Sequence, residues 1–211
     1  MTNSEEMERL YIRQDIAQGV RGSRARSDQI TSIRLLRKPN TTIIQVCAPT
    51  IGAEEDEIER FYTSIQEEID HTPKEDMLIT IGDWNTEVGN RAKSNITGKF
   101  ELGVRNEAGD WLMNFCKASN LSIAETCFKQ LNRQLYTRTS ADGRHRNQID
   151  HVTRSRRWRS CVPSARTRPG ADCGTDHELL ITIVKVKLRK STRTIVLKYN
   201  VNTFPTNLKF T

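Results

Sequence analysis

Hydrophobic and polar residues follow two different periodicities along the chain. In residues 28–50 they predict two strands that flank a turn at 38–40. In residues 53–72 the apolar side chains recur at helical spacing and follow a run of acidic residues, which is typical of a helix N-terminus. The short apolar run at 78–81 indicates a buried strand, and the sequence Gly-Asp-Trp-Asn begins directly after it.

The second half of the chain continues this pattern and then becomes rich in turn residues. Residues 106–120 predict a second amphipathic helix, and residues 121–128 predict a short strand. We expect a hairpin at 135–155, closed by the turn 141–143, and a closing strand at 176–188. This order predicts an α/β protein in which helices pack outside a mixed sheet.

No internal repeat or low-complexity linker divides the 211 residues. We therefore expect one principal domain, at residues 29–190. Residues 1–28 are expected to form an N-terminal segment that is partly disordered or helical. Residues 191–211 are expected to form a basic, loosely ordered tail.

The net charge of +7 and the pI of about 9.3 favour a polyanionic partner such as nucleic acid. Five cysteines without a C-x-x-C pair argue against a disulfide framework or a cysteine zinc cluster. We therefore expect reduced thiols in a nuclear or cytoplasmic protein that is not secreted and has no membrane partner. The segment RSRRWRS at 154–160 fits a nuclear signal or a solvated basic loop, and we favour the loop.

Polar side chains stand at the ends of three predicted strands. Asp83 and Asn85 follow the run 78–81, Asp150 lies in NQIDHV, and Asp176 precedes His177 in GTDHELL. Each has an ordinary structural explanation: a polar turn, a hydrogen-bonded strand residue, or a surface histidine at the start of a strand. The carboxyl ends of strands are also where α/β proteins bind their ligands, so the set is a candidate site.

Taken together, these residues suit the cleavage of a phosphodiester. The reaction requires cations on the phosphate oxygens and an activated water. Asp176 offers oxygen ligands for Mg²⁺, Asp83 could orient or deprotonate the water, and Asn85 could donate to the phosphate. His177 could donate to the same phosphate if Asp150 keeps it charged.

The motifs GDWN, IDHV and GTDHELL, in this order, resemble the later motifs of the endonuclease/exonuclease/phosphatase family. Longer stretches, from about residue 16 to about residue 190, are similar to the endonuclease region of LINE-type retrotransposons; they are IIQVCAPT, FELGVRNEAG, HRNQIDHV and RTRPGADCGTDHELL. The resemblance implies a partial four-layer α-β-β-α sandwich of the DNase I type. Its sheets would be mixed and largely antiparallel, with the first strands missing.

The resemblance also implies roles for the matching residues. Asp83 and Asn85 would position the attacking water and the phosphate, and Asp176 would serve a Mg²⁺ (or Mn²⁺) site. His177 would stabilise the pentavalent phosphate, with Asp150 orienting its ring. The implied protein is a monomeric, Mg-dependent phosphodiesterase or endonuclease that acts on DNA and derives from a non-LTR retrotransposon.

Several positions depart from the family pattern. Cys47 replaces a tyrosine at the phosphate site, and Arg138 replaces a tryptophan. Glu125 stands where an asparagine is usual and is expected to repel phosphate, whereas His151 is a milder replacement for tyrosine. We find neither the Asn nor the metal-binding Glu motif with which the family begins, so the chain is expected to be N-terminally truncated.

These departures leave two functions open. The chain is either a nuclease of weak or no activity, or a non-catalytic remnant that binds nucleic acid or a protein. A lipid phosphatase or sphingomyelinase is disfavoured by the basic charge.

Arginines are concentrated around the second and third motifs, where few acidic residues offset them. They are Arg144, Arg146, Arg154, Arg156, Arg157, Arg159, Arg166 and Arg168. We predict nucleic-acid contacts at Arg144, Arg146, Arg156, Arg157 and Arg168, in preference to a merely solvated surface.

Overall fold

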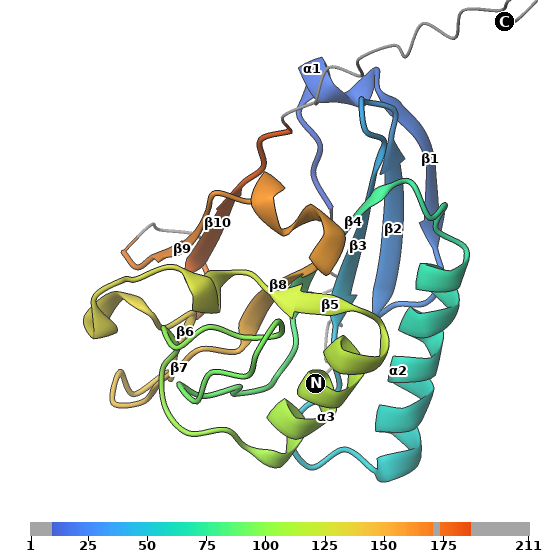
Figure 1. The fold of residues 1–211 in the computed structure, drawn as a ribbon. Coiled ribbons are helices and arrows are strands. Elements are labelled where there is room, and N and C mark those ends of the chain that lie inside the picture. The colour runs from blue at the N-terminus through green and yellow to red at the C-terminus, as the bar shows by residue number, and fades with distance from the viewer. Residues whose placement is uncertain (1–9, 171–173, 187–211) are drawn as a thin grey trace, which may run out of the picture.

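The computed structural model describes residues 10–170 and 174–186, and a six-stranded sheet lies at its centre (Figure 1). The strands lie in the order β1 (Val20–Ala25), β2 (Ile30–Leu35), β3 (Thr41–Cys47), β4 (Met77–Asp83), β8 (Asp150–Ser155) and β5 (Leu121–Ile123). Within this sheet β3 and β4 are parallel, and the other neighbouring pairs are antiparallel. The predicted mixed, largely antiparallel α/β fold is therefore confirmed.

Shorter elements surround this sheet. The helices are α1 (Gln14–Ala17), α2 (Glu55–Asp70) and α3 (Glu107–Ala118), and the 3₁₀ turns are η1 (Glu125–Cys127), η2 (Asn132–Gln134) and η3 (Arg156–Cys161). Two further pairs of strands are β6 (Arg138–Thr139) with β7 (Arg146–Asn147), and β9 (Ser164–Arg168) with β10 (Leu179–Ile183).

Helices α2 and α3 cover one face of the sheet. Ile44 of β3 and Leu78 of β4 pack there against Phe61 of α2 and Leu112 of α3 in one buried cluster. Each side chain of this size that is fully buried contributes roughly 1.5–3 kcal/mol to folding. Helix α2 also connects β3 to β4, and a connection of this length is what parallel neighbours require.

The β9–β10 pair covers part of the opposite face. Ile79 of β4 and Val152 of β8 pack there against Ala165 of β9 and Val162, with Leu180 of β10 partly buried beside them. In Figure 1 this pair lies on the other side of the sheet from α2. The described residues thus form a helix layer, a sheet and a second layer of strands.

The observed strands differ from the predicted ones at three places. β1 lies within the predicted N-terminal segment 1–28, and β9 lies where no strand was expected. The hairpin expected at 135–155 is wrong for its last part: β6 and β7 pair around residues 141–143, but β8 pairs with β4 and β5. Residues 1–9 and the predicted tail 191–211 lie outside the described residues.

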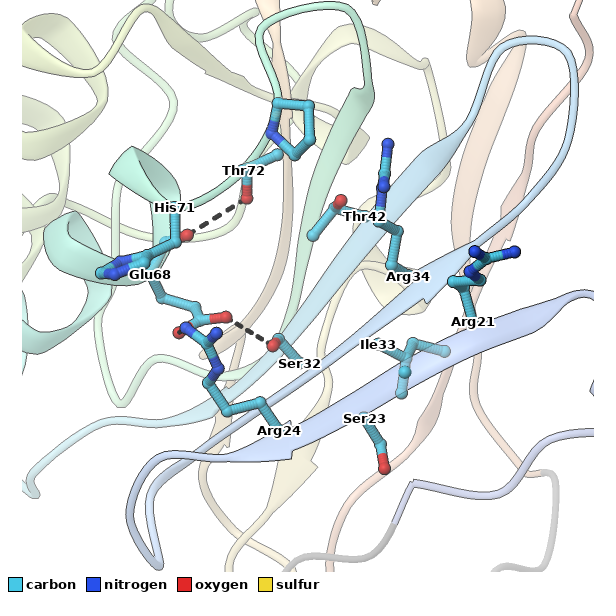
Figure 2. Close-up of a pocket in the computed structure, with 12 residues that line it drawn as sticks. Arg21, Ser23, Arg24, Ser32, Ile33, Arg34, Thr42, Glu68, His71 and Thr72 are labelled. Atoms are coloured by element: carbon cyan, nitrogen blue, oxygen red, sulfur yellow. Dashed lines mark hydrogen bonds and ion pairs between the residues drawn. The ribbon is translucent and has the colours of Figure 1, made fainter.

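Polar contacts fasten the C-terminal end of α2 to the strands β1 and β2. A cavity of about 290 Å³ lies at this junction. Figure 2 shows Arg21 and Arg24 of β1 and Arg34 of β2 around it. Glu68 of α2 accepts a hydrogen bond of 2.5 Å from Ser32 and lies 3.6 Å from Arg24 Nη1. Arg34 Nε lies 2.7 Å from Asp76 Oδ2. Acidic side chains therefore balance two of the cavity's arginines.

None of the helices described is long and apolar enough to cross a membrane.

Candidate active site at the strand ends

The end of β4 is shaped by a close approach of backbones at Gly82. Its φ angle is +137°, and an added Cβ atom would lie 1.9 Å from the carbonyl oxygen of Val46 in the neighbouring β3. Only glycine combines this φ with this lack of space. The glycine of the Gly-Asp-Trp-Asn sequence therefore allows β4 to end tightly against β3, which fixes the position of Asp83.

The next three residues point in different directions. Trp84 is fully buried beside Phe61 and Phe115, as expected of a core residue. Asp83 Oδ1 accepts a hydrogen bond of 2.8 Å from the backbone N–H of Asn85, whose φ is +48°. Asn85 Nδ2 donates to the Ala48 carbonyl at 2.8 Å, and the residue is 8% exposed. Asn85 thus ties the loop after β3 to the end of β4.

Asp150 stands beside Asp83 across the sheet. The two are paired residues of the antiparallel strands β4 and β8, so their side chains share one face. Thr137 Oγ1 accepts hydrogen bonds from the backbone N–H groups of Ile149 and Asp150, at 2.9 and 3.0 Å. These two bonds fix the start of β8 and hence the position of the Asp150 carboxylate.

His177 joins the carboxylates. Its Nδ1 lies 3.0 Å from Asp150 Oδ2, and its Nε2 lies 3.9 Å from Asp83 Oδ2 and 4.0 Å from Asp176 Oδ1. Backbone hydrogen bonds hold the segment in place: Thr139 N–H donates to the Asp176 carbonyl, and Glu178 N–H donates to the Thr137 carbonyl. Four of the predicted residues therefore meet in one cleft, although they come from distant parts of the chain.

The charge of His177 is set by these neighbours. The hydrogen bond to Asp150 raises the pKa of His177, partial burial opposes this shift, and the carboxylates of Asp83 and Asp176 raise the pKa further. Because Asp150 faces Nδ1, the second ring nitrogen, Nε2, remains to donate a hydrogen bond into the cleft. The arrangement thus favours an imidazolium aimed at the space between Asp83 and Asp176.

Asp176 is already paired with a cation. Arg138 Nε donates to Asp176 Oδ2 at 2.8 Å, and this bond lowers the pKa of the Asp176 carboxyl group. The side chain of Asp176 is 44% exposed. Arg138 therefore occupies one oxygen of the carboxylate that was predicted to serve the metal.

The cleft continues into an apolar cavity of about 540 Å³. Asp150 and His177 line it together with Ile79 and Ile81 of β4 and Leu180 of β10. Cys47, predicted at a substituted phosphate position, ends β3 in register with Asp83 and is partly exposed. The predicted positions around the cleft thus lie at one end of an opening between the two layers of strands.

The predicted nucleic-acid-binding arginines fall into two groups. Arg144 and Arg146 lie exposed on the β6–β7 hairpin, and Arg168 pairs with Leu179 in the strand that follows His177. All three belong to the side of the molecule that holds the cleft.

Arg156 and Arg157 follow β8 at the end opposite Asp150. Arg156 donates to the backbone carbonyls of Leu121 and Cys116, and Arg157 stacks on Trp158. Arg154, which we expected among the surface arginines, is only 2% exposed.

The sequence did not predict a second cluster of ionisable residues, on the other face of β8. His151 is fully buried, its Nδ1 lies 2.7 Å from Glu125 Oε1, and Glu101 Oε1 lies 4.0 Å from the same nitrogen. The expectation that Glu125 repels phosphate in the cleft is wrong, because its carboxylate binds His151 and the N–H of Val152 instead. Glu101 lies in a loop without apolar periodicity, so no sequence signal pointed to it.

Two curated sequences are similar to most of the chain. Craniofacial development protein 2 of Tragulus javanicus is 49% identical over 188 residues, which are 87% of this chain and 33% of that protein. The protein of the same name from Bos taurus is 48% identical and is covered to 32%. The chain thus spans about a third of the length of these relatives. No protein-family model matches it.

Solved structures of low sequence identity share the fold. The endonuclease domain of TRAS1, a telomere-specific non-LTR retrotransposon, superposes with a TM-score of 0.54 at 18% identity; the match covers 75% of this chain and 63% of that one. The 3′ phosphatase NExo from Neisseria, bound to a product DNA hairpin, gives 0.56 at 12% identity, with 79% and 72% covered. The chain is therefore related to craniofacial development protein 2 over the part they share, and it has the fold of the endonuclease/exonuclease/phosphatase proteins.

Proposed function

We propose that the cleft is a divalent-metal-dependent phosphodiesterase site of the endonuclease type, that it acts weakly on DNA, and that the chain derives from a non-LTR retrotransposon. One observation carries the proposal: His177 Nε2 faces both Asp83 and Asp176 within 4.0 Å while Asp150 holds its other ring nitrogen. An endonuclease domain, an exonuclease and a 3′ phosphatase bound to a product DNA hairpin share the fold, which adds support.

Each side chain has a separate task in this proposal. The His177 imidazolium donates from Nε2 to a non-bridging phosphate oxygen and stabilises the charge of the pentavalent state. Asp150 keeps the ring charged and oriented. Asp83 accepts a hydrogen bond from the attacking water and receives its proton. Asn85 positions Asp83 through the N–H that Oδ1 accepts.

The donors present fit Mg²⁺ or Mn²⁺ in their chemistry. These ions prefer oxygen ligands and are commonly held by one or two protein carboxylates together with phosphate oxygens of the substrate. Asp176 would hold the ion, which would withdraw negative charge from the phosphate. Arg138 competes with the ion for Asp176, and this competition is the physical reason for the weak activity that we propose.

The arginines favour a second candidate function. Arg144, Arg146 and Arg168 lie exposed on the side of the cleft, so they can contact phosphates without any chemical step. Under this alternative the chain binds nucleic acid and does not cut it.

Nicking of supercoiled plasmid by the purified chain in Mg²⁺ tests the first proposal. We expect nicking that EDTA abolishes and that His177→Ala lowers at least about 100-fold, as is usual when a donor to an oxyanion is removed. His145→Ala is the matched control, because His145 is exposed on the nearby hairpin and its Nδ1 lies 3.9 Å from Asp142 of the same turn.

The outcomes separate the two functions. If both histidine variants nick equally well, a contaminating nuclease explains the activity and the catalytic proposal fails. If the parent chain binds DNA in a salt-sensitive way but never nicks it, the binding function replaces the catalytic one.

A further inference from the structure

Three ionisable side chains, those of Glu101, Glu125 and His151, form a buried cluster that the proposed function does not use. His151 comes from β8, Glu125 from η1, and Glu101 from the loop that precedes α3. All three side chains are at most 4% exposed. One ligand atom of each lies within 4.8 Å of the others.

Glu101 is the unusual member. Neither of its carboxyl oxygens has a hydrogen-bond partner, and both are inaccessible to solvent. A buried polar group without a partner typically costs about 1–3 kcal/mol, and a charged one costs more. Its nearest cationic atom is His151 Nδ1, 4.0 Å away, which is too long for a hydrogen bond.

The backbone holds Glu101 in this position from both sides. The N–H of Phe100 donates to the Thr126 carbonyl at 3.0 Å, and the N–H of Leu102 donates to Gln148 Oε1 at 3.2 Å. Because residues 100 and 102 are both fastened, the backbone of Glu101 is held in place beside the other two residues. The Glu101 side chain lies buried there, with its carboxyl group 4.0 Å from His151 Nδ1.

His151 is oriented as a metal ligand. Its Nε2 lies 2.9 Å from the Thr86 carbonyl oxygen, which can only accept, so Nε2 carries a hydrogen. Histidines that bind metals commonly donate one ring N–H to a backbone carbonyl and coordinate through the other nitrogen. Nδ1 is the nitrogen that faces both glutamates.

We propose that Glu101, Glu125 and His151 form a structural Zn²⁺ site inside the fold. Four donor atoms come from three residues: His151 Nδ1, Glu125 Oε1 and both oxygens of Glu101. Glu125 Oε2 already accepts from the Val152 N–H at 3.2 Å, which orients that carboxylate. Two carboxylates and a neutral imidazole balance the charge of one divalent ion, and the unpaired oxygens of Glu101 acquire a partner.

The side chains need only small movements to accept the ion. Zinc lies about 2.0–2.2 Å from nitrogen and oxygen ligands, which places donors of different residues about 3.3–3.6 Å apart; the two oxygens of Glu101 stand closer together because they share one carbon, so the four-coordinate site is distorted. The Glu125–His151 contact must therefore open from 2.7 Å, and the Glu101–His151 contact must close slightly from 4.0 Å. Because the cluster is enclosed, the ion is expected to enter as the chain folds.

This site is separate from the cleft and does not rest on the proposed function. Successive side chains of a strand point to opposite faces, so Asp150 faces the cleft and His151 faces the helices. The test uses a chain in which two of the four cleft residues are replaced by Asp176→Asn and His177→Ala. This background removes the carboxylate that we propose to hold the ion at the candidate active site.

Metal-free protein on this background is unfolded in urea, refolded with Zn²⁺ or Co²⁺, and freed of loose metal by gel filtration. We expect one Zn²⁺ per chain by elemental analysis. The Co²⁺ form should show the intense visible absorption of four-coordinate Co²⁺ and no near-ultraviolet band from a thiolate ligand.

Glu101→Gln supplies the decisive comparison, because it keeps the shape of the side chain and removes its charge. Zinc affinity should fall at least about 100-fold, which is more than the loss typical when a residue that only hydrogen-bonds to a metal ligand is replaced. The variant should still fold, since a buried acid without a partner is replaced by an amide. Glu68→Gln is the matched control, because Glu68 is a buried glutamate on α2, bound to Ser32 and Arg24. Its zinc affinity should equal that of the parent.

Three results would overturn the proposal. The first is the absence of retained zinc in the chain that carries only Asp176→Asn and His177→Ala. The second is equal zinc affinity in the Glu101→Gln and Glu68→Gln chains. The third is a weak six-coordinate Co²⁺ spectrum or a thiolate band, which would place the ion at the surface or on a cysteine.

Discussion

His177 Nδ1 lies 3.0 Å from Asp150 Oδ2, and this contact is the main reason that the pKa of His177 is raised. Asp150→Asn should therefore lower the pKa of His177 and reduce the fraction of imidazolium near neutral pH. Titration of the histidine resonances by NMR in the parent and the variant measures the shift directly. An unchanged His177 titration in the variant would mean that Asp150 does not control the charge of the ring.

Stability should fall as the pH rises when no metal is present. Burial alone would lower the pKa of His151, but the hydrogen bond and charge of Glu125, with the charge of Glu101, raise it from 6.5 to about 9. Because folding raises the pKa of His151, its contribution to the free energy of unfolding is fully present below pH 6.5. This contribution is lost as the pH rises through about 9. Burial also raises the pKa of Glu101, so its ionisation acts in the same direction.

Urea unfolding in EDTA at a series of pH values measures this dependence. The free energy of unfolding should decline between pH 6.5 and 9, and Glu101→Gln should reduce the decline because it removes one of the two titrations. A stability that increases over this interval would contradict the assigned charges of the cluster.

Gly82→Ala should be strongly destabilising. The new Cβ atom would lie 1.9 Å from the Val46 carbonyl oxygen, at a φ of +137°. We expect a loss of about 3 kcal/mol or more, because a backbone atom must move. Gly22→Ala in β1 is the matched control, with no atom within 4 Å of the added Cβ. Chemical denaturation compares the two, and equal losses would refute the close approach at β4.

Arg138→Gln should increase Mg²⁺ affinity. It removes the cation 2.8 Å from Asp176 Oδ2 and frees that oxygen for the ion. An increase of roughly tenfold is expected, equivalent to about 1.4 kcal/mol. Calorimetric titration with Mg²⁺ measures it, and Arg146→Gln on the same hairpin serves as the control, since Arg146 stacks on Tyr136. A gain common to both variants would show only a general charge effect.

Removal of Arg144 and Arg146 together should weaken DNA binding and its salt dependence. Two lost phosphate contacts are expected to reduce the slope of log affinity against log salt by about 1.8. Arg60→Ala should leave the slope unchanged, because Arg60 is exposed on α2, on the other side of the sheet from the β9–β10 pair. Fluorescence anisotropy with labelled duplex over a range of salt concentrations gives both slopes.

Much of the fold followed from local patterns. Helix α2 and the strands β2, β3 and β4 have clear periodicity, and the structure places them where the apolar residues predicted. The strand β1 was missed because its side chains are mostly exposed and carry no alternation. The partner of β8 was misassigned because pairing with β4 depends on residues far apart in sequence, and a turn signal reports only on neighbours.

In the candidate site, too, the local motifs were predictable from sequence and the contacts between distant residues were not. Gly82 and Asp83 form a local motif, and the order of motifs along the chain indicated that Asp150 and His177 would join them. The role of Glu101 could not be predicted, because the position of its segment depends on hydrogen bonds from the neighbouring residues Phe100 and Leu102 to Thr126 and Gln148, which are distant in sequence. Arg138 was recognised as a substitution, but its pairing with Asp176 required the bridge that joins β6 to residue 177.

The opposite orientations of Asp150 and His151 constrain how β8 can be assembled. A slip of one position against β4 would turn the His151 ring out of the interior and drive the Asp150 carboxylate into it. Both exchanges would be costly, since each side chain would lose its ionic partner. The opposite faces that Asp150 and His151 require thus favour a single alignment of β8 with β4.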